Sequence, residues 1–72
     1  MNDREKLRHL LHHWMEHNLE HAEVYREWAG KTASSGDEEL SKVLDTLCGE
    51  TKNLNRLIED ALKKIKWDVS LF

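Results

Sequence analysis

The chain has 72 residues, of which 39% are hydrophobic and 35% are charged. Its eleven basic and fourteen acidic residues are interspersed and give a formal net charge of −3, whereas a nucleic-acid-binding domain normally carries a basic face. No apolar run approaches the roughly 20 residues that cross a bilayer. The composition therefore excludes a membrane span and argues against nucleic acid as a partner.

The first residues and the cysteine content favour a cytoplasmic protein. Met1 is followed by a polar Asn-Asp-Arg-Glu-Lys segment instead of the apolar stretch of a signal peptide. Cys48 is the single cysteine, so no intramolecular disulfide can form.

With no proline and only three glycines, the chain is expected to form one all-α domain over residues 1–72. Apolar residues recur at helical spacing from the start, which predicts a first helix over about residues 3–34, capped by Asn2 or Asp3. Two antiparallel helices, joined by a turn over residues 34–37, are the expected hairpin.

The turn is predicted from Gly36, which can take a left-handed conformation, and from a possible capping box between Ser35 and Glu38. A second helix is expected over about residues 37–66, with acidic residues in its first turn and lysines in its last. Residues 67–72 form an apolar tail, which either docks on a neighbour or frays.

A broad apolar stripe runs along the first helix when it is read with a period of 3.5 residues. Its central column is Leu7, Trp14, His21 and Trp28, flanked by Leu10, His17 and Val24 and by Leu11, Asn18 and Tyr25. The second helix repeats the pattern, with Leu40, Leu47, Leu54, Ala61 and Leu44, Thr51, Ile58, Ile65 as its seam, flanked by Val43, Glu50, Leu57 and by Cys48, Asn55, Leu62. Three columns exceed what one partner helix covers, so the pattern favours two hairpins in a four-helix bundle, a homodimer, over an isolated pair.

Both stripes turn polar midway, at His17, Asn18 and His21 in one helix and at Glu50 and Thr51 in the other. Folding back at the turn should bring together residues whose numbers sum to about 70, which sets His21 near Cys48 and Asn18 near Thr51. Buried polar groups without partners cost several kcal/mol. We therefore expect these side chains to point into the seam, where they satisfy each other or bind a ligand.

Histidines supply the main functional clue, because all five lie between residues 9 and 21 and four of them are spaced by four. This spacing places imidazoles on one helix face, where two can hold a metal ion. His17 and His21 are the expected ligands, with Glu50 as a carboxylate ligand and His13 or Cys48 as secondary candidates. Imidazole suits Zn, Ni, Co, Cu and Fe.

The alternative is a hydrogen-bonded polar layer, including Asn18 and Thr51, that only sets the register and oligomeric state of the bundle. The Glu-x-x-His spacing of diiron bundles and the Cys-x-x-Cys motif are both absent from the sequence. The residues thus leave both interpretations open.

The segment 13–29 resembles a family of small uncharacterised prokaryotic proteins with the pattern His-Trp-x-x-His-Asn-x-x-His-Ala-x-x-Tyr-x-x-Trp-Ala. The resemblance covers the first helix well and the second only in its Leu-rich character. It implies a helical hairpin with a special first helix and no reaction.

Three functions follow from these features. The leading hypothesis is a transition-metal-binding helical bundle that stores, senses or hands over the metal. The second is a structural oligomerisation or protein-interaction module whose activity belongs to a partner. A metal-dependent enzyme is the least favoured, because two helices enclose little volume for a substrate.

Overall fold

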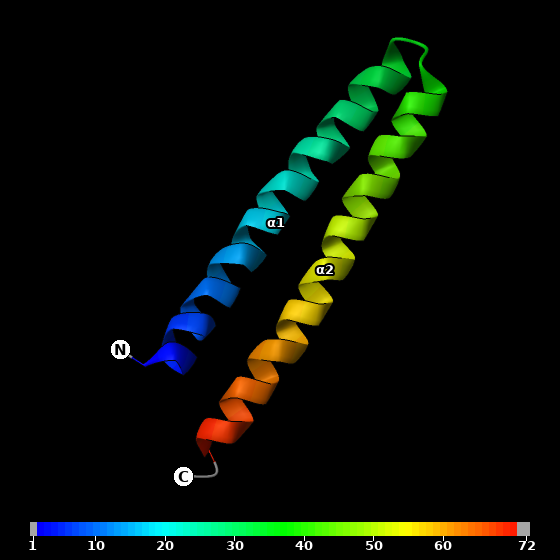
Figure 1. Cartoon of the computed structure of the whole chain (residues 1–72). Helices are drawn as coiled ribbons and strands as arrows, with labels where there is room; N and C mark the ends of the chain where they lie inside the picture. Colours follow the sequence, from blue (N-terminus) through cyan, green and yellow to red (C-terminus); the bar gives the residue numbers. More distant parts are fainter. Residues whose placement is uncertain (1, 71–72) are drawn as a thin grey trace.

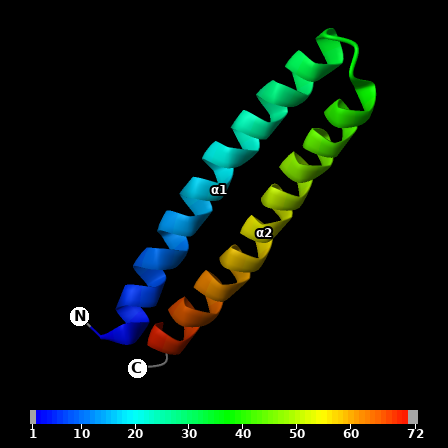
Figure 2. The same cartoon turned by 45° about the horizontal axis from the view of Figure 1, so that its top comes forward.

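A computed structural model describes the backbone of residues 2–70 and the side chains of residues 2–65. Two long helices, α1 (Asp3–Ser34) and α2 (Glu38–Ser70), run antiparallel and side by side (Figure 1, Figure 2). The hairpin is narrow, with extents of 57 × 18 × 12 Å. In the described part of the chain, neither helix is apolar enough to cross a membrane.

The start of α1 and the turn take the conformations that their residues favour. The Glu5 backbone N–H donates to the Asn2 side-chain oxygen at 2.8 Å, so Asn2 is the residue that caps α1. Gly36 has a φ of 91°, a left-handed conformation that costs glycine little. The turn is therefore closed by the glycine that the sequence indicated.

The expected capping box between Ser35 and Glu38 is wrong. The Leu40 backbone N–H donates to the Asp37 carboxylate at 3.3 Å, and α2 begins at Glu38. Asp37 therefore stands immediately before the first helical residue, where an acidic side chain both accepts a hydrogen bond and meets the positive end of the helix dipole.

The second helix continues past Lys66 to Ser70. The predicted apolar tail, residues 67–72, is thus helical as far as Ser70, because no proline or glycine interrupts the chain there. Residues 71–72 lie outside the described residues, as does the docking predicted for the tail's side chains.

The contact between the helices combines small and polar residues with Leu, Ile, Met and Tyr side chains. We call the residues that face the opposite helix the inner seam; all are buried or half-buried and follow heptad spacing. They are Arg8, Leu11, Met15, Asn18, Ala22, Tyr25, Ala29 and Thr32 in α1, and Ser41, Leu44, Cys48, Thr51, Asn55, Ile58, Leu62 and Ile65 in α2. The expected central column of α1, with Leu7, Trp14, His21 and Trp28, is exposed instead.

Hydrogen bonds cross the inner seam at three places among the side chains of residues 8–65. The Ser41 hydroxyl donates to the Ala29 carbonyl at 2.8 Å, and the Asn55 amide donates to the Met15 carbonyl at 3.1 Å. The Asn18 amide donates to the Asn55 side-chain oxygen at 2.9 Å. Short side chains that reach the backbone of the other helix require the two helices to lie close together.

The predicted register, in which facing residues sum to about 70, agrees with the Ser41–Ala29 and Asn55–Met15 hydrogen bonds. It sets Asn18 and Thr51 at about the same level, but their hydrogen bonds go to other partners. Side chains lean toward the N-terminus of their own helix, so Asn18 leans away from the turn, toward Asn55, whereas Thr51 leans toward the turn. The Thr51 hydroxyl donates instead to the Leu47 carbonyl of its own helix at 2.7 Å.

Replacing Asn55 by alanine tests the polar bonds of the inner seam. The Asn18 amide would lose its partner in the half-buried seam, and a buried polar group without a partner costs about 1–3 kcal/mol. We expect N55A to lower the free energy of unfolding by that amount. N53A, the same change at an exposed position of α2, should stay within about 0.5 kcal/mol of the native protein. Urea unfolding at one protein concentration measures both, and equal losses would contradict the proposed role.

Two Gly→Ala variants should shift stability in opposite directions. G36A forces a side chain into a left-handed conformation and should cost about 1–2 kcal/mol. G49A lies within α2 with open space around the added methyl group, and should stabilise by up to about 1 kcal/mol. Thermal unfolding followed by circular dichroism compares the two variants, and a shift of the same sign in both would refute this assignment.

Candidate functional site

A second heptad series precedes the inner seam by one residue in both helices. Its members, which we call the outer seam, are Leu7, Leu10, Trp14, His17, His21, Val24 and Trp28 in α1, and Leu40, Val43, Leu47, Glu50, Leu54, Leu57 and Ala61 in α2. One residue back is a rotation of about 100° around a helix axis. Because the helices are antiparallel, the two rotations have opposite senses and turn both series toward the same side of the hairpin, the outer face.

The outer face exposes most of the large apolar side chains of the hairpin. Trp28 is 51% exposed and Leu57 is 66% exposed, and the face is apolar toward both of its ends. Among the described residues, no large side chain is fully buried. Large exposed apolar patches commonly mark interaction sites in folded proteins.

The opposite side of the hairpin is charged. We call it the polar face, and it consists of exposed residues one position after the inner seam: His9, His12, Glu16, Leu19, Glu23 and Arg26 in α1, and Lys42, Asp45, Lys52, Arg56, Glu59 and Lys63 in α2. Among these, Leu19 alone is a large apolar residue. The hairpin as a whole is therefore amphipathic, with a charged polar face and a largely apolar outer face.

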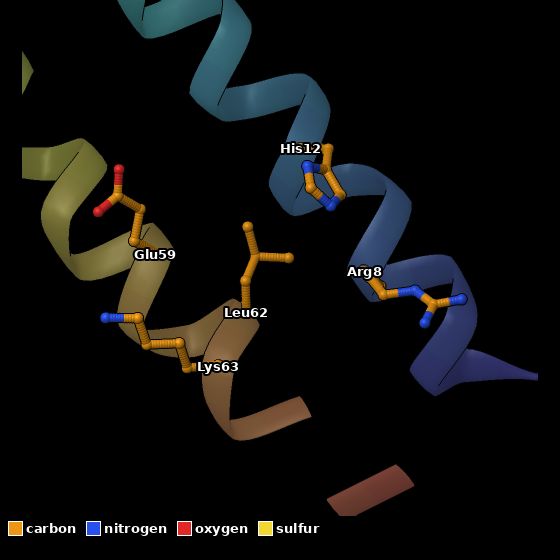
Figure 3. A pocket seen from close by; sticks show the side chains of 5 residues that line it. All are labelled: Arg8, His12, Glu59, Leu62 and Lys63. Atoms are coloured by element: carbon orange, nitrogen blue, oxygen red, sulfur yellow. The ribbon is translucent and has the colours of Figure 1, made fainter. Parts of the chain in front are cut away.

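A hollow of about 480 Å³ opens near the chain termini (Figure 3). Arg8 and His12 line it from α1, and Glu59, Leu62 and Lys63 line it from α2, with Leu62 pointing into the space between the helices. Charged groups of both signs surround it, and it holds no set of converging ligands. We therefore place the functional site elsewhere.

Imidazole rings form a row along α1. The ring centroids of His13 and His17 lie 4.8 Å apart, those of His17 and His21 lie 5.6 Å apart, and Tyr25 stacks on His21 at 6.0 Å. All three histidines are exposed. The structure thus brings His17 and His21 together on the outer face, with His13 at its edge.

The two other ligand candidates lie on different surfaces. Glu50 is exposed on the outer seam of α2, and the Ser41–Ala29 and Asn55–Met15 hydrogen bonds set a register that places it close to the level of His21. Cys48 is buried in the inner seam. Within the side chains that the structure describes, one chain contains no group of three His, Cys, Asp or Glu residues that could hold a metal ion.

The expectation that the polar residues form a single layer between the two helices is wrong. Asn18 and Thr51 lie in the inner seam, whereas His17, His21 and Glu50 lie on the outer face. Small residues such as Ala22 and Ala29 lie between the helices, whereas the column that contains Trp14 and Trp28 faces outward. The imidazole and carboxylate groups consequently face outward from a single hairpin.

Two polar residues that join the helices are missing from the seam that the sequence predicts. The heptad pattern places Asn55 beside the seam and Ser41 outside it, yet both donate hydrogen bonds to the backbone of α1. The spacing of Ala22 and Ala29 by seven residues could have predicted which row faces the other helix, because small residues at heptad spacing indicate a close helix contact.

A domain of unknown function, DUF8180, matches residues 7–65. The chain belongs to this family. An uncharacterised protein of Archaeoglobus fulgidus is 42% identical over 60 residues, which cover 83% of this chain and 89% of the archaeal protein. No solved structure matches the chain. The DUF8180 match and the archaeal relative confirm membership in a family of small uncharacterised prokaryotic proteins.

Proposed function

We propose that this DUF8180 protein is an assembly module in which two copies pack their outer faces together as a four-helix bundle. The observation that supports the proposal most strongly is the outer face itself, where two Trp residues and a series of Leu and Val residues are exposed at heptad spacing on both helices. Heptad spacing is the pattern that allows side chains to interlock with a facing helix.

The exposed area agrees with this arrangement. The hairpin exposes 5871 Å², whereas a compact monomer of 8.5 kDa exposes roughly 4,700 Å², an excess of about 1,200 Å². A standard interface buries about 800 Å² on each partner. The surplus is therefore large enough for one face of a stable dimer.

A second copy fits this face because the outer seam is symmetric in character, apolar toward both ends and polar in the middle. A twofold axis that lies in the interface and crosses the helices at mid-length brings apolar ends against apolar ends and polar middle against polar middle. On α1, this middle lies between His17 and His21.

Charge favours placing the two turns at opposite ends of the dimer. Residues 27–45, around the turn, contain five acidic and two basic residues. Residues 3–8 and 59–66, at the open end, contain six basic and four acidic residues. An antiparallel dimer sets the acidic end of each copy against the basic end of the other, which makes this orientation more favourable than its parallel alternative.

Two Leu→Glu variants separate the outer face from the polar face. Leu54 on the outer face and Leu19 on the polar face are 52% and 50% exposed in the hairpin, so the free chain should tolerate both changes alike. In the dimer, only the glutamate of L54E would be buried without a partner, which costs several kcal/mol. We expect L54E to be monomeric and L19E to remain dimeric by size-exclusion chromatography with light scattering.

If both variants and the native chain are monomeric, the outer face serves a different helical protein and self-assembly is refuted. If both variants remain dimeric, the interface lies on another surface. Circular dichroism confirms that each variant keeps its helices.

The orientation of the dimer can be measured with a spin label in the turn. We expect labels on S35C, in a C48A background, to lie roughly 45–50 Å apart, because about sixteen residues at 1.5 Å each separate the turn from the twofold axis. In a parallel dimer the two turns would be neighbours, about 20 Å apart or less. Double electron–electron resonance distinguishes these distances.

A further inference from the structure

We infer that the dimer binds one transition-metal ion at its twofold axis, held by His17 and His21 from both copies. The inference rests on the proposed assembly, since the antiparallel orientation sets α1 of one copy against α1 of the other. The axis then passes between His17 and His21 of each copy. Four imidazoles therefore converge midway along the bundle.

Geometry within one chain prepares half of this site. The His17 and His21 rings lie one helical turn apart, with centroids separated by 5.6 Å, so two ring nitrogens can reach one ion from the same side. Two imidazoles leave a tetrahedral ion half-coordinated. Because the described side chains of one chain supply no third ligand, the second copy completes the set.

Burial in the dimer provides a second reason for a cation at this point. Glu50 lies on the outer seam between Leu47 and Leu54, near the level of His21. In the bundle its carboxylate would be enclosed by apolar side chains, which is costly unless a cation or a hydrogen-bond donor balances it. A metal ion held by four imidazoles supplies the positive charge, and Glu50 can accept a hydrogen bond from the free N–H of a coordinated imidazole.

The ligand chemistry narrows the choice of metal. Neutral imidazole suits Zn²⁺, Co²⁺, Ni²⁺ and Cu²⁺. The thiol of Cys48 is buried in the inner seam and belongs to a different face, so the site has no sulfur ligand. His13 stands at the edge of the outer face and forms the next ring of the row, beyond the four that converge.

Cobalt titration of the full chain, purified without a histidine tag and stripped with a chelator, tests the inference. We expect saturation at half an equivalent of Co²⁺ per chain, with the visible absorption bands of a tetrahedral ion, and displacement by Zn²⁺. H21A should weaken binding by at least about a hundredfold, because even the loss of an outer partner of a ligand costs ten- to a hundredfold. H12A, a histidine removed from the polar face, should bind as the native chain does.

The outcomes separate the metal site from the assembly. A native dimer that binds no Co²⁺, or binding that H21A leaves unchanged, overturns the shared site and leaves the assembly intact. Retention of binding by monomeric L54E, with its helices confirmed by circular dichroism, shows a site within one chain and also overturns sharing. A native dimer that binds half an equivalent of Co²⁺ per chain, with binding lost in H21A and in monomeric L54E, supports both proposals.

Discussion

The close approach of α1 and α2 is the constraint on which the rest of the structure depends. Ser41 and Asn55 reach the backbone of the opposite helix, and Ala22 and Ala29 occupy the seam between the helices. These small side chains leave no room for Trp beside them, although Leu, Ile and Tyr residues fill other positions of the inner seam. The Trp residues and a second row of Leu and Val residues are displaced by one residue around each helix, and the antiparallel arrangement turns both displaced rows to the same side.

This displacement separates two tasks that one polar layer was expected to perform. The Asn18–Asn55 pair, inside the hairpin, satisfies its own hydrogen bonds and sets the register of the two helices. His17, His21 and Glu50 are exposed in the middle of the outer face. The hydrogen bonds that join the two helices thus lie within one chain, whereas the proposed pairing and the proposed ligand site belong to the outer face.

Much of the fold could be predicted from the sequence, because capping residues, a single glycine turn and helical spacing are local signals. Asn2 and Gly36 acted as their chemistry indicates. The rotation of the helices could not be predicted in the same way. Because Trp14 and Trp28 are large and apolar, the sequence pattern favours a core position for them. Which of two adjacent heptad rows faces the partner helix depends instead on how closely the backbones pack. His17 and His21 were correctly grouped, since their spacing is local, but the side of the hairpin to which they belong followed from that nonlocal choice.

Sedimentation equilibrium of the unmodified chain over a range of concentrations tests the central claim most directly. We predict a reversible association that ends at twice the chain mass of 8.5 kDa, because the proposed dimer covers the outer face. A single species at the chain mass throughout, with the helices intact, would mean that the outer face is stable in water and that a second copy does not cover it.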